Sequence, residues 1–305
     1  MPTTSCRARL LSATALACGT LTLSGGSARA ACQPDPPNGA PVVTCDNDVN
    51  GFAAPPADDL TVDVNGNING TIPGNPNGAA ISFDGNTANK ALNNRGSING
   101  NITAIDNAGN VTIYQGGNLN GGVTITGTGT NTLTLARNAN GFVSMQGTSN
   151  TVDVAATMNQ GLQLTGSAFN NVVIRSGGTV NTTFRLTGGG QNSVDNYGRI
   201  NGNATIDGTG TSAFINRPSA EVTETLQSVG TSEDSFLMLG GRIRSVRLGD
   251  GDDQAWINGG TLVEGIATGA GEDRLLWDGG RIDNGGIDMG DDDDVATFRG
   301  LTAEI

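Results

Sequence analysis

The chain has 305 residues, contains no histidine and carries a formal net charge of −13 at pH 7. The lack of histidine excludes Ser-His-Asp and Cys-His nucleophilic chemistry and any imidazole metal site. The negative charge argues against nucleic acid and anionic membranes as partners, because binding to phosphate requires basic side chains.

The first thirty residues have the pattern of an export signal. Arg7 and Arg9 precede an apolar run, and the run is followed by Ala28-Arg29-Ala30, which fits an A-x-A cleavage site. The run is short for a membrane span, and no later segment has the length or apolarity of a transmembrane helix. We therefore expect a signal peptide at residues 1–30 and an exported mature chain that does not itself insert into a membrane.

Two of the four cysteines belong to the signal, and the other two, Cys32 and Cys45, flank a proline-rich stretch at the new N-terminus. An oxidising compartment and a short loop favour a disulfide between them. Lipid attachment at Cys18 or Cys32 is the weaker alternative, because neither follows a clear run of apolar and small residues. We expect residues 31–57 to form an N-terminal cap that is closed by the disulfide.

From residue 58 onward, apolar residues recur about every twenty positions. One column of such positions comprises Leu133, Val152, Val172, Val194, Phe214, Phe236, Ala255, Leu275 and Val295. A second column lies two residues further on and comprises Leu135, Val154, Ile174, Asn196, Asn216, Met238, Ile257 and Trp277. Short alternating runs, such as Thr-Leu-Thr-Leu at 132–135, indicate strands with one buried face.

A strand unit this short cannot bury its apolar face alone, so neighbouring units must stack on it. About twenty residues suffice for one turn of a parallel β-helix and are too few for a four-stranded propeller blade. The sequence therefore predicts an all-β fold over residues 58–305, a right-handed parallel β-helix (solenoid) with about twenty residues per coil. Unrelated hairpins or disorder would not keep the apolar positions in register.

The chain resembles the passenger region of bacterial autotransporters (type V secretion). The mature start "ACQPDPPNGAPVVTCDNDVNGF" is similar to the cysteine-pair opening of such passengers, and the "GDGDD…INGGTLVEGI" units resemble their acidic late coils. The Asn/Gly/Thr-rich coils also have a matching length. These loose motifs extend over nearly the whole chain, and they imply a surface-exposed or secreted structural stalk, often adhesive.

Members of this family end in a C-terminal β-barrel that anchors them in the outer membrane. This chain ends at "LTAEI" and contains no such barrel. We therefore expect it to be a fragment of a longer polypeptide, with a truncated product as the alternative. Its expected location is the cell surface or the extracellular space, associated with the outer membrane if the full-length protein has a barrel.

Acidic residues are concentrated near the end of the chain. Residues 1–220 carry ten basic and eleven acidic side chains (net −1), whereas residues 221–305 carry six and eighteen (net −12). Two residues before the first apolar column, a polar corner position changes from amide to carboxylate along the chain: Asn131, Asn150, Asn170, Asn192, Ser212, Asp234, Asp253, Asp273 and Asp293. Stacked asparagines can hydrogen-bond between coils. Ionised aspartates in the same place repel one another unless they are solvated, protonated or bound to a cation.

Three interpretations of the acidic corners remain open. A solvated acidic edge that keeps the rod soluble requires no cofactor. Calcium is the second, because "GDGDDQA" and "GAGEDRL" partly match a calcium-binding repeat. The candidate calcium ligands are Asp250, Asp252, Asp253, Glu272, Asp273, Asp291, Asp292 and Asp293. Catalytic carboxylates are the third and weakest, because an active site should be a local exception to the repeat and no coil stands out.

An outward-facing apolar stripe is the second candidate site. Residues one position after the first column should point outward, and four consecutive ones are apolar: Ile215, Leu237, Trp256 and Leu276. A contiguous exposed apolar surface often marks an interaction site, unless the irregular segment 216–227 covers it.

The expected function is a non-enzymatic exported passenger, a structural stalk or adhesin at the bacterial surface. A host surface, the extracellular matrix or a second copy of the chain would be its partner. The alternatives are a calcium-binding secreted repeat protein and a polysaccharide-active β-helix enzyme.

Overall fold

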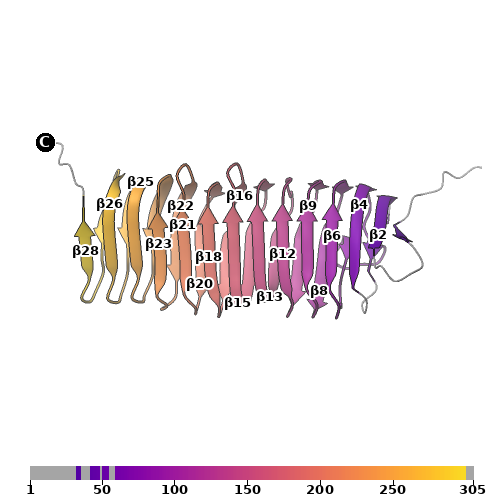
Figure 1. Cartoon of the computed structure of the whole chain (residues 1–305), viewed down its shortest axis with the longest axis horizontal. Coiled ribbons are helices and arrows are strands. Elements are labelled where there is room, and N and C mark those ends of the chain that lie inside the picture. Colours follow the sequence, from indigo (N-terminus) through magenta and orange to yellow (C-terminus); the bar gives the residue numbers. More distant parts are fainter. Residues whose placement is uncertain (1–31, 36–41, 49, 55–58, 300–305) are drawn as a thin grey trace, which may run out of the picture.

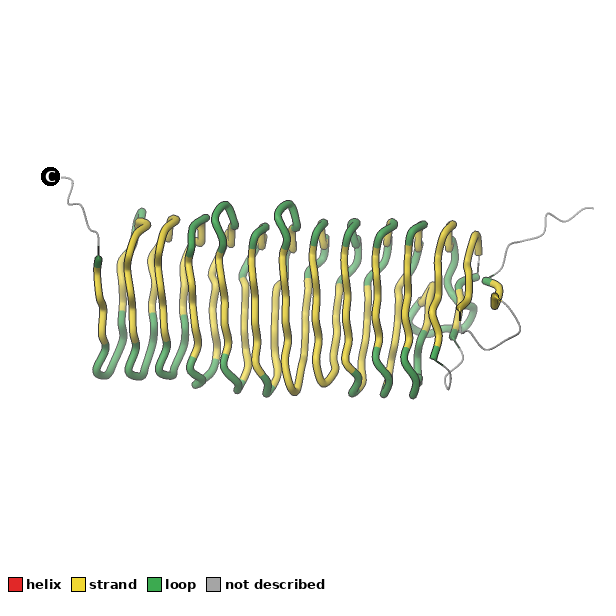
Figure 2. Tube along the Cα trace, viewed as in Figure 1, coloured by secondary structure: helices red, strands yellow, loops and turns green. Residues whose placement is uncertain are grey.

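The computed structural model describes residues 32–35, 42–48, 50–54 and 59–299. These residues form strands, turns and loops stacked into one rod (Figures 1 and 2). Within them, no helix is long and apolar enough to cross a membrane. The expected signal peptide at 1–30 lies outside the described residues.

The rod is a parallel β-solenoid with roughly 20 residues between successive turns, as predicted, and it has about 13 turns. In chain order the strands are β1 (Gln33–Asp35), β2 (Val42–Asp48), β3 (Phe52–Ala53), β4 (Leu60–Ile68), β5 (Ala79–Ser82), β6 (Lys90–Asn94), β7 (Ser97–Ile98), β8 (Asn101–Asn107), β9 (Val111–Gln115), β10 (Asn118–Leu119), β11 (Val123–Gly127), β12 (Thr130–Leu135), β13 (Val143–Val154), β14 (Thr157–Met158), β15 (Leu162–Ile174), β16 (Thr179–Asn181), β17 (Phe184–Gly188), β18 (Gln191–Asn196), β19 (Arg199–Asn201), β20 (Ala204–Gly208), β21 (Ser212–Asn216), β22 (Glu221–Val229), β23 (Asp234–Met238), β24 (Arg242–Arg247), β25 (Gln254–Ala267), β26 (Arg274–Ile282), β27 (Gly286–Asp288) and β28 (Val295–Phe298).

Strand pairing confirms the register of the two apolar columns. Leu133 pairs with Val152 and Leu135 with Val154, and the pairing continues coil by coil to Leu275 and Trp277. The first column also extends toward the N-terminus, through Ile113, Leu92, Val62 and Val43. The repeat therefore begins well before the coils in which the sequence shows it most clearly.

The last member of the first column was predicted one residue too early. Leu275 pairs with Ala296, whereas Val295 pairs with Arg274. The cause is one additional residue in the preceding turn. Leu262 pairs with Ile282 twenty positions on, but Gly265 pairs with Gly286 twenty-one positions on.

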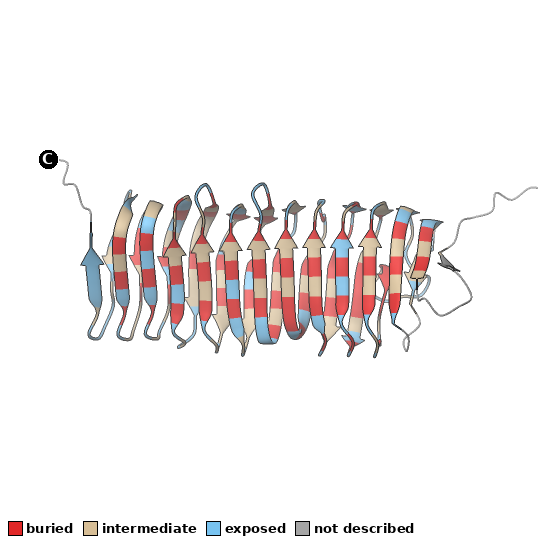
Figure 3. Ribbon diagram, in the orientation of Figure 1, coloured by how far each residue is buried: buried red, intermediate tan, exposed pale blue. Residues whose placement is uncertain are grey.

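Inward-facing side chains stack on one another from coil to coil and form a continuous core. Figure 3 shows buried residues alternating with more exposed ones along most strands, as in β9 and β12. Each buried Val, Leu or Ile side chain contributes about 1.5–3 kcal/mol relative to exposure, and stacking supplies these contacts between coils. All four residues of β28 are exposed.

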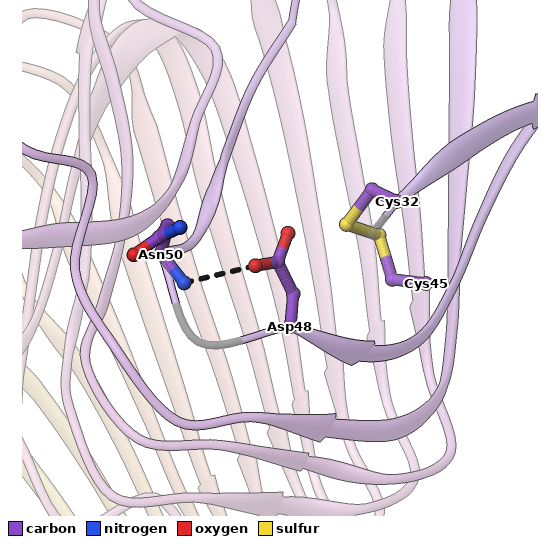
Figure 4. The surroundings of a disulfide bond; sticks show 4 residues. All are labelled: Cys32, Cys45, Asp48 and Asn50. Atoms are coloured by element: carbon purple, nitrogen blue, oxygen red, sulfur yellow. Dashed lines mark hydrogen bonds between the residues drawn. A yellow bond between two sulfur atoms is a disulfide. The ribbon is translucent and has the colours of Figure 1, made fainter. Parts of the chain in front are cut away.

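At the N-terminal end, the predicted disulfide joins Cys32 to Cys45 (Figure 4). β1 pairs antiparallel with β2, and β2 pairs parallel with β4. Nearby, the Asn50 backbone N–H donates to Asp48 Oδ1 at 2.9 Å (Figure 4). Cys45 is fully buried in the core and pairs with Val64. Parallel stacking thus begins within the segment 31–57 that the sequence assigned to a cap.

Candidate functional site

The repeated G-x-G pattern is explained by the backbone of the acidic corners. Its glycines have positive φ angles: Gly249 (+99°), Gly251 (+124°), Gly269 (+120°) and Gly271 (+127°). This region of backbone space favours glycine. A Cβ placed on Gly269 would lie 1.5 Å from the carbonyl oxygen of Gly249 in the previous coil. The glycines are therefore required by the turn and by close stacking, without any ligand.

In the third acidic corner, an aspartate replaces the second glycine of the G-x-G pattern. Ala270 bridges to Asp291, so Asp292 occupies the place of Gly271. Asp292 accordingly has a φ of +91°, which a residue with a side chain adopts only with strain. Its Oδ2 accepts a 3.2 Å hydrogen bond from the Gly271 N–H, which ties this corner to the previous one.

The first aspartates of the corner column point into the rod. Asp234 is 4% exposed, and Asp253 and Asp273 are 0% exposed. The Asp234 N–H donates to Asp253 Oδ1 at 2.7 Å, and the Asp253 N–H donates to Asp273 Oδ1 at 2.8 Å. The interpretation of the corners as a solvated acidic edge is therefore wrong for these three residues.

The column continues through Asp294 rather than the predicted Asp293. The Asp273 N–H donates to Asp294 Oδ1 at 2.9 Å. The one-residue shift is the same as that between Val295 and Ala296, and it comes from the same additional residue in the preceding turn.

The earlier half of the column is the predicted amide ladder. Asn131, Asn150 and Asn170 each donate from Nδ2 to the Oδ1 of the next asparagine, at 3.0, 2.9 and 2.9 Å. An ionised carboxylate has no N–H to donate. In the later coils, backbone N–H groups therefore replace the side-chain donors.

Burial changes the protonation of this column. It raises the pKa of Asp253 to about 8; the nearby carboxylates of Asp234, Asp273 and Asp252 add to the rise, and the Asp234 N–H opposes it. Burial also raises the pKa of Asp234, against the lowering effect of its hydrogen bonds, the largest of which comes from the Ser228 hydroxyl. Among the described residues, Oδ2 of Asp253 and Oδ2 of Asp273 have no hydrogen-bond partner. At pH 7 the Asp253 carboxyl is mostly protonated.

The other candidate calcium ligands lie outside. These exposed residues are Asp250, Asp252, Glu272, Asp291, Asp292 and Asp293. Four of them line one open depression, namely Asp252, Glu272, Asp292 and Asp293. The predicted ligand set is thus divided between the core and the surface. Over the described ranges, no three acidic or cysteine side chains are grouped as a metal site requires.

The predicted apolar stripe is one column of paired, outward-facing residues. Ile215 pairs with Leu237, Leu237 with Trp256, and Trp256 with Leu276. Trp256 is 43% exposed, and the other three are half-buried. The segment 216–227 does not cover them, because its strand β22 pairs with β19, β20 and β24 on the other sides of the coil.

An open groove of about 430 Å³ runs over the end of the stripe. Its lining includes Leu237, Trp256 and Leu276, together with Gln254, Arg274 and Arg299. The Trp256 indole Nε1–H donates to Asp278 Oδ2 at 3.0 Å, which fixes the orientation of the ring.

A second amide ladder, on the outer surface, was missed by the sequence analysis. Each of seven coils contains an apolar residue followed by asparagine, and these asparagines are Asn69, Asn99, Asn120, Asn140, Asn159, Asn181 and Asn201. Every consecutive pair is joined by a hydrogen bond from Nδ2 to Oδ1. The recurrence of this dipeptide once per coil is the signal that could have revealed the ladder.

Comparison with known proteins gives no match to a family model, a curated protein or a solved structure. A fold of this kind can host many unrelated functions. The function is therefore argued from the surfaces and interior of the solenoid itself.

Proposed function

We propose that the chain is the passenger region of an exported bacterial surface protein of the autotransporter type. In this role it is a non-enzymatic stalk that presents an adhesive surface. The observation that carries the proposal is a continuous rod whose outer face bears an uncovered apolar column that runs from Ile215 through Trp256 to Leu276.

The hydrogen-bonded columns support the stalk. At about 4.8 Å per coil, about 13 turns span roughly 60 Å. The asparagines of the internal column and of the external ladder link successive coils side chain to side chain, and the internal aspartates accept backbone N–H groups of the preceding coil. Such links add to the backbone pairing, so they resist separation of the coils along the rod.

The placement of the carboxylates supports a structural role over catalysis. Asp253 and Asp273 each accept a backbone N–H and face the core. The same arrangement recurs in successive coils, whereas a general acid or base must reach a substrate. The acidic column therefore works as part of the stacking.

The stripe supports adhesion. Monomeric proteins rarely leave a contiguous apolar patch uncovered unless it serves an interaction. Trp256 lies within this stripe between Leu237 and Leu276, and tryptophan is enriched among residues that dominate binding energy. A partner is therefore expected to bind at the coils around β25.

Adhesion and export can be tested with the whole chain. Expressed with its own N-terminus in a Gram-negative host, the protein should be exported, with its mature end at Ala31. Beads coated with the exported protein should adhere to extracellular-matrix and epithelial surfaces. Adhesion should fall in the variant Leu237→Ser/Trp256→Ser and persist in Asn120→Ser/Asn140→Ser, which alters the external ladder. Retention in the cytoplasm, or equal adhesion of both variants, would contradict the proposal.

A further inference from the structure

The groove over the stripe differs in charge from the coils around it. Residues 221–305 have a net charge of −12, from six basic and eighteen acidic side chains. Yet the only charged residues that line the groove, in the described part of the chain, are Arg274 and Arg299. The groove is therefore a local basic site within an acidic region, and its charge complements an anion.

Arg274 is available for such an anion. It lies on the exposed face of β26, paired with Gln254 on one side and Val295 on the other. Within the described residues its guanidinium forms no salt bridge, whereas Arg299 lies 3.9 Å from Asp278. A planar guanidinium binds a carboxylate through two parallel hydrogen bonds.

Trp256 adds a flat apolar surface beside this cation. Its N–H is committed to Asp278, so the ring rather than its polar edge is presented to a ligand. Gln254, on the same strand, offers an amide that can both donate and accept hydrogen bonds. These are the groups that a sugar ring requires, with an apolar face to stack on and polar partners for its hydroxyls.

We infer that this groove binds an acidic sugar chain, with Trp256 stacking on a ring and Arg274 pairing with its carboxylate. The inference rests on the proposed adhesive function and names the ligand class of that surface. The groove, at about 430 Å³, has a size typical of small-ligand sites.

A peptide fits this surface less well. Extended peptides usually bind by adding a strand to a free sheet edge. The strands that carry Trp256 and Arg274, β25 and β26, are paired on both sides. In the described part of the chain, a peptide could therefore add a strand to this sheet only beside β28, at the rim of the groove and not over Trp256 and Arg274. A second copy of the chain would bring two regions of net charge −12 together, and like charges would oppose that contact.

The test is calorimetric titration of the full chain with a galacturonic acid trimer and with a neutral galactose trimer. The acidic trimer should bind more tightly, and its affinity should fall as salt is added. Arg274→Gln should lower affinity for the acidic trimer by about tenfold or more and leave that for the neutral trimer unchanged. Trp256→Ala should weaken both.

Arg247→Gln is the matched control, because Arg247 is exposed on β24 and also forms no salt bridge within the described residues. It should bind like the unaltered chain, and circular dichroism should show all variants folded. Equal affinity for the two trimers, or an unaffected Arg274→Gln, would overturn the inference. In that case, adhesion that still depends on Trp256 would leave the proposed function standing. Cleavage of the trimer would instead contradict the non-enzymatic function.

Discussion

The backbone N–H of Asp234 donates a 2.7 Å hydrogen bond to the carboxyl group of Asp253 in the next coil. One oxygen of this buried carboxyl is thus satisfied, and the other has no partner among the described residues. An ionised carboxylate in such a place is costly because its charge is desolvated. The column is therefore most compatible with folding when Asp253 carries a proton.

The stability of the acidic coils should therefore fall as the pH rises. The pKa of Asp253 is about 8 in the folded chain, against an ordinary value of 3.8. The folded state binds this proton more tightly than the unfolded state. Its contribution is thus fully present below about pH 4 and is lost as the pH rises through about 8. Hydrogen exchange measured by mass spectrometry should show less protection of β23, β25 and β26 at pH 9 than at pH 6, after correction for intrinsic exchange rates.

Asp253→Asn should flatten this profile and stabilise the coils at pH 9. An asparagine keeps an oxygen that can accept the Asp234 N–H, and it cannot ionise. In the amide half of the column, asparagine oxygens already accept hydrogen bonds at this position, from the side-chain Nδ2 of the preceding asparagine. Each pKa unit removed corresponds to at most about 1.4 kcal/mol. Asp250→Asn, at an exposed residue of the same acidic corner, serves as the control and should retain the pH dependence, because the Asp250 carboxylate is not one of those that raise the pKa of Asp253. An unchanged profile in Asp253→Asn would show that another group titrates.

Alanine substitutions at two glycines, Gly269 and Gly177, should distinguish the stability cost of close packing from that of backbone conformation. Gly269 and Gly177 both have positive φ angles, +120° and +85°. A Cβ on Gly269 would lie 1.5 Å from a backbone oxygen, whereas a Cβ on Gly177 would meet nothing within 4 Å. Gly177→Ala should cost about 1 kcal/mol through its left-handed backbone. Gly269→Ala should cost about 3 kcal/mol or more, since the coils must also move apart. Urea denaturation followed by circular dichroism would compare them, and equal losses would contradict the stacked corner.

The two amide ladders should differ in their contribution to stability. Buried Asn150 donates to Asn170 and accepts from Asn131, so Asn150→Ala leaves buried partners unsatisfied and should cost about 1–3 kcal/mol. Exposed Asn140 occupies an equivalent place in the outer ladder, but water can replace its bonds. Asn140→Ala should therefore cost less than about 0.5 kcal/mol. Thermal melting of the two variants provides the comparison, and a larger loss for Asn140→Ala would overturn this ranking.

The fold could be predicted because its determinant is local and repeated. The apolar residues at Leu133, Val152 and Val172 recur at nearly constant spacing, and the structure pairs them. Val295 was placed wrongly because an added residue in a turn changes neither the apolar pattern nor the composition. Only pairing to the previous strand reveals it.

The interior of the acidic column was harder to foresee. Ionised aspartates are expected at the surface, and the sequence left three interpretations open for Asp253: a solvated edge, a calcium ligand or a catalytic carboxylate. Whether a corner residue faces inward depends on where the backbone bends, and the sequence pattern does not encode this directly.

The external ladder was missed for another reason. A single buried residue between two exposed ones, as at Leu119, is too short an alternation to stand out as a strand.

Calcium should have little specific effect on the rod. Two of the predicted ligands, Asp253 and Asp273, are buried and bonded to backbone N–H groups. The exposed Asp252 also accepts a bond from the Glu272 N–H, at 2.9 Å. Melting curves with calcium, with magnesium at equal ionic strength and with chelator should therefore agree within a few degrees. A ligand that binds only the folded state must raise its stability. A rise that is specific to calcium and abolished by Asp252→Asn/Asp292→Asn, but not by Asp253→Asn, would establish a metal site in the outer depression.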